Sequence, residues 1–318
     1  PSREDLSIKQ IPISDDDLVA FEKMVAAEFD EMTHGFAGRG LSEKQFKSAL
    51  KAFDKIGINE VSFDGETYLQ GPYISLAGQG LPRNLIEDGL KQGRMVSIKT
   101  FGGILNTLAR AYLTSADAIQ KEALEARFML ATRAYLQSGW AAGSNMGALH
   151  HLGYNTRKIA PSFFMMRQEL AAAGLLQKVS DSLNWFAVAH VVNDETHTDP
   201  DLDLFNTVLY THYLATMMRP DSSDSARHAK LLSQWLSRTY ADDTRRGGFR
   251  NDGTAWHHWG HYPAYAGGAI DNAVKVANKL TLAGFPLDSN GHAALQRAVK
   301  TIMLYQQGDR YPRSLSGR

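Results

Sequence analysis

The sequence contains no cysteine, no excess of charge of either sign and no long apolar run. The lack of cysteine excludes disulfides and thiolate chemistry, although many secreted bacterial proteins also lack cysteine and the compartment stays open. Lys and Arg together number 34, as do Asp and Glu, so the net charge indicates no polyanionic partner, while a local basic groove is still allowed. No apolar run approaches the roughly 18–20 residues that span a bilayer. We therefore expect neither a membrane nor a nucleic acid as partner.

The two ends of the sequence have the pattern that we expect of an excised piece. It begins Pro1-Ser2-Arg3, without a methionine or a signal-peptide pattern, and ends Ser316-Gly317-Arg318. Its 318 residues, 43% apolar and 21% charged, are enough for a large folded core. No interior linker is rich enough in Gly, Ser or Pro to divide the chain. We expect residues 1–318 to form a single domain that is a fragment of a larger chain.

The dominant pattern is helical, with no convincing ladder of strands. Ser14 before three aspartates predicts a helix start, Ser42 with Gln45 forms a capping box, and the Thr114–Asp117 pair predicts another start. The periodicity fails over residues 58–81, where recurring Gly and Pro and short β-like pieces such as Val61-Ser62-Phe63 favour a long loop. Further helices are expected around residues 162–178, 180–193, 202–219, 223–240, 267–283 and 290–306. Such hairpins suit a bundle, a solenoid or an α/α toroid, and the pattern alone does not choose among them.

One stretch, residues 245–268, does not follow a helical pattern, and glycines and Pro263 interrupt it. Its second half is dense in histidine, tryptophan and tyrosine, which can stack on sugars and transfer protons. Three interpretations are open: an aromatic loop packed over a core, a zinc site of His257, His258 and His261, or acid–base chemistry on a carbohydrate. Pro263 and the glycines disfavour zinc, because they prevent the helix that presents two histidines on one face.

The run from Asp252 to Tyr265 closely resembles the active-site loop of chondroitin ABC lyases, members of polysaccharide lyase family 8. It reads Asp-Gly-Thr-Ala-Trp-His-His-Trp-Gly-His-Tyr-Pro-Ala-Tyr. The family has Asp-Gly-Thr-Ala-Trp, a variable residue, the catalytic histidine and, seven positions later, the catalytic tyrosine. The resemblance implies that His258 and Tyr265 are these two residues. Arg318, in a Gly-Arg pair at the end of the chain, is similar in position to the catalytic arginine of the family.

A second segment resembles the wall of the substrate cleft in the same family. His150-His151-Leu152-Gly153-Tyr154 is similar to a His-His-Trp-Gly-Tyr segment, with Leu152 in place of the family's tryptophan. The residues that we expect to contact substrate are His150, His151, Arg157, Trp140, Trp256 and His257. Plainer roles stay open for them: a packed histidine pair in a helix, a surface ion pair for the arginine, and core packing for the tryptophans. A further family counterpart, residues 201–207, is interpreted as structural.

The resemblance implies cleavage by β-elimination at a uronic acid, giving 4,5-unsaturated products. The C5 proton leaves as the C4 glycosidic oxygen departs, so the reaction needs a base, an acid and neutralisation of the carboxylate. Tyr265 can serve as acid, and as base if nearby positive charge lowers its pKa from the ordinary value near ~10. Arg318 is the source of charge that the resemblance implies. His258 is expected to be the base for one uronate epimer, or a partner of the carboxylate.

The same resemblance sets the remaining expectations. The helical pattern already predicts an all-α fold, and the resemblance implies that it is an incomplete α/α toroid of antiparallel helical hairpins. The expected partners are a sulfated glycosaminoglycan (chondroitin or dermatan sulfate, with hyaluronan also open) and a following β-rich domain of the same chain that supplies a catalytic glutamate. The sequence requires no cofactor and shows no metal site, and calcium could act only through residues that it does not identify. The expected location is periplasmic or secreted.

Two other classes of function are alternatives. A glycoside hydrolase on an α/α toroid needs two carboxyl groups roughly 5–9.5 Å apart. Asp252 is the only carboxylate within the stretch 245–268, so Asp194 or Glu195 would have to supply the second. A non-catalytic carbohydrate-binding domain would use the aromatic loop for binding, but it has no need of a histidine and a tyrosine in family register.

Overall fold

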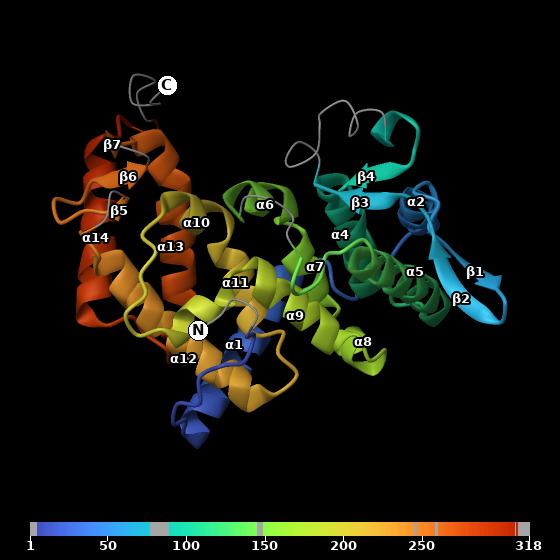
Figure 1. Cartoon of the computed structure of the whole chain (residues 1–318), viewed down its shortest axis with the longest axis horizontal. Helices are drawn as coiled ribbons and strands as arrows, with labels where there is room; N and C mark the ends of the chain where they lie inside the picture. The colour runs from blue at the N-terminus through green and yellow to red at the C-terminus, as the bar shows by residue number, and fades with distance from the viewer. Residues whose placement is uncertain are drawn as a thin grey trace. The chain divides into compact units, whose positions relative to one another are not determined.

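The computed structural model describes residues 5–76, 89–144, 149–244, 247–257, 260–308 and 310, without the side chains of residues 149–151 and 264. Helices make up most of this part of the chain, joined by short turns and a few short strands (Figure 1). No helix in it is both long enough and apolar enough to cross a membrane. The all-α prediction is confirmed, whereas closure of the hairpins into an incomplete toroid stays a prediction.

The chain divides into two compact units. The terminal unit consists of Pro1–Ala26 and Asn184–Arg318, and the middle unit of Ala27–Leu183. The division falls inside two helices, α1 (Asp15–Thr33) and α9 (Leu176–Phe186). The expectation of one domain over residues 1–318 stays a prediction.

The middle unit is helical, with two small two-stranded sheets. Its other helices are α2 (Glu43–Asp54), α4 (Ile98–Thr114), α5 (Ala118–Gln137), α6 (Leu149–Thr156), α7 (Ile159–Met165) and α8 (Arg167–Ala172). Its strands are β1 (Asn59–Phe63), β2 (Glu66–Gln70), β3 (Tyr73–Ser75) and β4 (Met95–Ser97). β1 and β2 form an antiparallel hairpin, and β3 and β4 pair in parallel. The prediction of a long loop over residues 58–81 is therefore wrong for the residues before 77. The β-like piece Val61-Ser62-Phe63 belongs to β1, and strands this short have too little alternating pattern to be distinguished from a loop.

The terminal unit carries the stretch that resembles an active-site loop. Its other helices are the 3₁₀-helix η1 (Ala189–Asn193), α10 (Leu202–Thr207), α11 (Leu209–Thr216), α12 (Ser222–Ala241), α13 (Pro263–Ala283) and α14 (Ser289–Leu304). Its strands, β5 (Gly248–Phe249), β6 (Ala255–His257) and β7 (Gly260–His261), form one antiparallel sheet in the order β5-β6-β7. In Figure 1 this sheet lies beside one end of α13 and α14.

Helix starts follow the capping signals of the sequence in most places. Ser14 and Asp17 exchange side-chain to backbone hydrogen bonds at the start of α1, and Ser42 and Gln45 do so at α2. The start predicted at Thr114 is wrong: Thr114 ends α4, and Asp117 alone caps α5 through the Gln120 amide. The sequence pattern missed α4 altogether.

Helix lengths were overestimated between residues 162 and 219. The predicted helices 162–178 and 202–219 are each interrupted, the first at Met166 and Gly174 and the second at Val208. The one predicted over 180–193 ends at Phe186, and a left-handed Val188 (φ 55°) separates it from η1. All these breaks fall in apolar sequence, where a uniform pattern hides the change of direction.

Each unit has its own aromatic core. In the middle unit Tyr135 lies 5.7 Å from Trp140 and 5.3 Å from Phe163, measured between ring centroids. In the terminal unit Phe205, Tyr240 and Phe249 lie 5.2–5.4 Å from one another, all of them almost fully buried. Each such ring contributes about 1.5–3 kcal/mol by burial. Phe249 belongs to β5, so this cluster anchors the short sheet to α10 and α12.

Candidate active site

The structure describes some of the predicted site residues and not others. His258 and Arg318 lie outside the described residues. His150 and His151 are in α6, but their side chains lie outside the description. The remaining predicted residues are described: Tyr265, His257 and Trp256 in the terminal unit, Trp140 and Arg157 in the middle unit.

The stretch from 245 to 268 is more regular than predicted. Within its described residues it holds all of β5, β6 and β7, and α13 begins at Pro263, five residues before the predicted irregular segment ends. Proline suits the first turn of a helix, where its missing N–H would have no partner in any case. Gly267 and Gly268 are accommodated inside α13. Tyr265 therefore lies on the first turn of a helix and not in a loop.

A tight turn precedes β6. Asp252 Oδ1 accepts hydrogen bonds from the Thr254 amide (2.8 Å) and hydroxyl (2.6 Å). These bonds lower the pKa of the exposed Asp252 carboxyl below its ordinary value. Gly253 between them has φ +81°, and a Cβ at that position would lie 2.1 Å from Thr301 Oγ1 and 2.7 Å from the Arg297 carbonyl oxygen. Only glycine fits there, because both the backbone angle and the neighbours exclude a side chain.

The same turn holds Trp256. The indole Nε1 donates a hydrogen bond of 2.9 Å to Thr254 Oγ1. The Arg250 guanidinium lies 5.3 Å from the centre of the indole ring system, and its Nε is 2.6 Å from Asp243 Oδ1. Trp256 is half-buried, so it presents an oriented aromatic surface next to a guanidinium.

The ring of His261 lies between β6 and the C-terminal end of α14. Its Nδ1 lies 3.1 Å from the Ala255 amide nitrogen and 3.0 Å from the Ala255 carbonyl oxygen. Its Nε2 lies 3.0 Å from the Tyr305 hydroxyl. Both ring nitrogens thus contact the surrounding protein. This arrangement disfavours the zinc site of three histidines that the sequence left open.

The described centre of the site is a group of three aromatic rings. The His257 imidazole and the Tyr265 phenol stack with centroids 4.3 Å apart and planes 7° from parallel. Tyr262 lies 6.0 Å from His257 and 5.5 Å from Tyr265, also stacked. His257 is only 9% exposed, whereas Tyr262 and Tyr265 are half-buried. The tyrosine that resembles a proton-transfer residue therefore contacts a buried ring and a second tyrosine, and these two also lie close to each other.

Helix α10 supports this group from the other side. Asp203 Oδ2 lies 3.8 Å from His257 Nε2. Asn272 Nδ2 on α13 donates a hydrogen bond of 2.8 Å to the Asn206 carbonyl oxygen on α10. A Cβ on Gly268 would lie 2.9 Å from Asn206 Oδ1, so glycine lets α13 approach α10 closely at its first turns. The sequence stretch interpreted as structural, residues 201–207, in this way forms one wall of the site.

Three groups at this wall could hold a metal ion. Asp201, Asp203 and His257 each offer one ligand atom, and these atoms lie within 4.8 Å of one another, the one such group among the described residues. The two carboxylates suit a hard cation such as calcium, whereas an imidazole is not a usual calcium ligand. The sequence pattern does not reveal this group as a metal site, because its members come from separate elements and match no metal-binding spacing.

The described candidates in the middle unit are placed differently. Trp140 is fully buried, stacks on Tyr135 and donates from Nε1 to the Ile74 carbonyl oxygen at 2.9 Å. Its position supports the alternative that it is a core tryptophan. Arg157 is exposed, with its guanidinium 5.1 Å from the centre of the Tyr154 ring. An exposed cation beside an aromatic ring is compatible with an anionic sugar, and equally with a plain surface contact.

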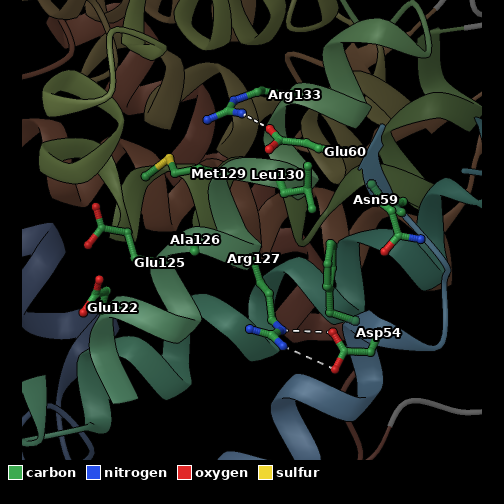
Figure 2. A pocket seen from close by; sticks show the side chains of 12 residues that line it. Asp54, Asn59, Glu60, Glu122, Glu125, Ala126, Arg127, Met129, Leu130 and Arg133 are labelled. Atoms are coloured by element: carbon green, nitrogen blue, oxygen red, sulfur yellow. Dashed lines mark hydrogen bonds and ion pairs between the residues drawn. The ribbon is translucent and has the colours of Figure 1, made fainter. Parts of the chain in front are cut away.

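A cleft of about 570 Å³ lies elsewhere in the middle unit, lined by α2, β1 and α5 (Figure 2). Arg127 pairs with Asp54 at 2.9 Å and Arg133 with Glu60 at 2.5 Å. Burial and neighbouring glutamates raise the pKa of Glu125, which faces the cleft beside a second glutamate. Because its arginines are paired and acidic groups outnumber them, this cleft disfavours a polyanion. None of the predicted site residues lines it.

Sequence reasoning missed three residues of the site: Tyr262, which stacks on Tyr265, Asp203, which faces His257, and Asn206, which contacts α13. Asp203 and Asn206 lie in the segment that had a family counterpart, and the Asp201-x-Asp203 pair is its one visible chemical signal. Tyr262 lies within the motif itself but matched no catalytic position. These side chains come into contact only through the packing of α10, β6 and α13.

Comparison with known proteins places this chain among lyases. A family model described as "Lyase, catalytic" matches residues 13–318. The chondroitin sulfate ABC endolyase of Proteus vulgaris is 27% identical over 306 residues, which cover 93% of this chain and 30% of that enzyme. The chondroitin sulfate ABC exolyases of Proteus vulgaris and Bacteroides thetaiotaomicron are 29% and 26% identical, over 68% and 70% of this chain and 22% of each enzyme. The chain thus spans less than a third of the length of these relatives.

Solved structures agree on the fold. The chondroitin AC lyase of Streptomyces coelicolor A3, in complex with chondroitin sulphate, aligns with a TM-score of 0.58 at 14% identity, over 88% of this chain and 35% of that one. A mutant of the same enzyme gives a TM-score of 0.54 at 13% identity. At such identity the likeness concerns the fold alone. Since the family model extends over almost the whole sequence, the chain belongs to the family of lyase catalytic domains.

Proposed function

We propose that this chain is the catalytic domain of a glycosaminoglycan lyase that cleaves chondroitin and dermatan sulfate by β-elimination at the uronic acid. The observation that carries the proposal is the position of Tyr265. It stands in family register seven residues after His258, on the first turn of α13, with its ring stacked on His257. Membership of the lyase family and the three chondroitin sulfate ABC lyases among its relatives support it.

The chemistry makes three demands on the site. The uronate carboxylate needs positive charge or hydrogen-bond donors, because removal of the C5 proton places a second negative charge beside it. A base must reach the C5 proton, and an acid must protonate the C4 oxygen as the glycosidic bond breaks. The product then carries a double bond between C4 and C5, conjugated with the carboxylate.

The residues of this chain divide these tasks as follows. Tyr265 protonates the leaving oxygen and, for one epimer of the uronate, also takes the C5 proton. His258 takes that proton for the other epimer or faces the developing carboxylate charge. Arg318 supplies a permanent positive charge that favours the phenolate form of Tyr265. Trp256 offers a sugar platform, and Arg250 beside it offers a cation for a sulfate or carboxylate.

The proposal extends to partners, cofactor and location. The substrate is a sulfated glycosaminoglycan, with hyaluronan as a further candidate, and a following β-rich domain of the parent protein supplies a catalytic glutamate. A divalent cation such as calcium, if the reaction uses one, would be held by Asp201 and Asp203. We place the parent protein in the periplasm or outside a bacterial cell, where such polysaccharides are accessible.

A glycoside hydrolase is the second candidate, and the carboxylates weigh against it. Asp252 accepts two hydrogen bonds from Thr254 within its turn, and its lowered pKa is opposite to what a general acid needs. Asp194 accepts hydrogen bonds from Thr196, and Glu195 pairs with Lys9 at 2.5 Å. Each of these groups already makes a structural contact.

Ultraviolet absorbance tests the proposal on the intact parent protein. With chondroitin sulfate, the unchanged protein should accumulate the unsaturated uronate. The rate of its formation should fall by at least ~10³-fold for Tyr265→Phe, which keeps the ring but removes the hydroxyl. Cleavage without the chromophore would transfer the assignment to a hydrolase. Binding of substrate without any cleavage would transfer it to a carbohydrate-binding domain.

A further inference from the structure

We infer that His257 is a positioning residue for Tyr265: its buried ring fixes the direction in which the phenol presents its hydroxyl. The inference rests on the proposed function, in which Tyr265 transfers the proton. His257 stands at the variable position of the family motif, so the proposed role follows from the packing of this chain and not from a family pattern. His257 itself need not touch the substrate.

The first support is the geometry of the stack. The two rings are 7° from parallel, with centroids 4.3 Å apart, which is face-to-face contact with a small offset. A phenol in such contact cannot swing about its Cα–Cβ bond toward His257. The Tyr262 ring, with its centroid 5.5 Å from that of Tyr265 and its plane at 28°, restricts a second side of the Tyr265 ring. The two neighbouring rings together limit movement of the Tyr265 ring out of its own plane.

The second support is that His257 is itself fixed. It is 9% exposed, lies in β6 between two hydrogen-bonded strands, and has Asp203 Oδ2 3.8 Å from its Nε2. Asp203 belongs to α10, and Tyr265 belongs to α13. The imidazole is thus the point at which α10, β6 and α13 meet. A contact made by three elements holds a side chain more rigidly than one within a flexible loop.

The third support is the demand of the reaction. Tyr265 must reach the leaving oxygen, and for one epimer also the C5 proton, so its hydroxyl has to stay within hydrogen-bond distance of both. A displacement of about 1 Å in such a group can lower a rate by roughly 100-fold. Loss of the stack should therefore reduce kcat and leave the binding of distant sugar units, and with it KM, nearly unchanged.

Three substitutions of His257 separate its ring from its polar edge. His257→Phe keeps a flat ring and loses the nitrogen that faces Asp203, His257→Asn keeps a polar group and loses the ring, and His257→Ala loses both. We expect kcat of the parent enzyme to stay within about 3-fold of the unchanged protein for His257→Phe, and to fall roughly 10- to 100-fold for the other two. KM should change by less than about 2-fold in all three. His292→Asn, at an exposed histidine of α14, is the matched control.

A spectroscopic measurement reports the stack without relying on activity. The parent protein labelled with 3-fluorotyrosine gives a ¹⁹F signal for Tyr265, assigned by its absence in Tyr265→Phe. That signal should stay close to its position in His257→Phe and shift and broaden in His257→Asn and His257→Ala, because the facing ring is gone. If the unchanged protein produced no unsaturated uronate, the proposed function would fail while this signal still showed whether His257 holds Tyr265.

Three results would overturn the inference. Full kcat in His257→Asn would show that the ring is dispensable. A larger loss in His257→Phe than in His257→Asn would assign the effect to the contact with Asp203. Loss in His257→Asn that added calcium or zinc restores, with the unchanged protein inhibited by a chelator, would make His257 a metal ligand.

Discussion

At the scale of single residues, Thr254 connects the turn at Asp252 to the indole of Trp256. Its hydroxyl donates to Asp252 Oδ1 at 2.6 Å and accepts from Trp256 Nε1 at 2.9 Å. One oxygen thus fixes both a backbone turn and the plane of an aromatic ring. If Trp256 is a sugar platform, its orientation depends on this hydroxyl.

Thr254→Val tests that connection, because valine has the same shape and no hydroxyl. We expect it to lose about 1 kcal/mol of stability per hydrogen bond removed and to raise KM for chondroitin sulfate by roughly 3- to 10-fold. The measurement is steady-state kinetics of the parent enzyme beside thermal unfolding. Thr254→Ser, which keeps the hydroxyl, should behave almost as the unchanged protein. An unaltered KM in Thr254→Val with a folded protein would remove Trp256 from the substrate site.

At the scale of elements, α14 packs closely against α12, and both helices contact the sheet that carries the site. A Cβ on Gly291 would lie 2.4 Å from the Ser237 Cα, which is backbone and cannot move aside. Ser237 Oγ accepts a hydrogen bond of 2.9 Å from the Asp288 amide, and Asp288 caps α14 through the Gly291 amide. The first turn of α14 is therefore attached to α12 by contact and by hydrogen bonds together.

Gly291→Ala should separate the two helices at this point. We expect the free energy of unfolding to fall by about 1–3 kcal/mol, the usual effect of overpacking, as measured by urea denaturation. Gly103→Ala on α4 is the matched control, because nothing lies within 4 Å of its added Cβ. There alanine should stabilise the helix by about 0.5–1 kcal/mol. Equal effects of the two substitutions would contradict the packing argument.

At the scale of the whole molecule, a buried histidine pair makes stability depend on pH. His212 and His228 are both buried, with their Nε2 atoms 3.0 Å apart, and Arg219 Nε donates to His228 Nδ1 at 3.0 Å. The same arginine binds the Leu6 carbonyl oxygen and Asn184 Oδ1. Burial, and then the Arg219 charge, lowers the pKa of His212 to about 3 and the pKa of His228 well below its ordinary value.

The unfolded chain binds protons at these histidines below about pH 6.5, and the folded protein does not. The contribution of these two histidines to the free energy of unfolding should therefore be fully present above pH 6.5. As the pH falls toward 3, the free energy of unfolding should decrease by up to about 1.4 kcal/mol per pH unit for each histidine. Urea denaturation between pH 7.5 and 4.5 measures this slope. The double variant His212→Gln with His228→Asn, which keeps neutral acceptors at the contacting positions, should show a shallower slope. An unchanged slope would mean that other groups cause the acid sensitivity.

Much of this protein can be predicted from its sequence, where the cause is local. The capping residues Ser14 and Ser42 act on amides within three residues. The last two predicted helices are found as α13 and α14, with α13 beginning earlier than expected. The motif from Asp252 to Tyr265 likewise carries its signal in consecutive residues. Composition and periodicity were sufficient for the all-α class, because amphipathic helices repeat their pattern along the chain.

The tertiary structure decided what depends on residues distant in sequence. Pro263 starts α13 and does not break a helix, because its ring fits the first turn of a helix. The helix begins there because β7 ends just before it. Gly253 and Gly291 are required by atoms of α14 and α12 that no local pattern reveals. The contact of Asp203, His257 and Tyr265 forms only when α10, β6 and α13 pack together, so the sequence could name a catalytic tyrosine but not the ring that holds it.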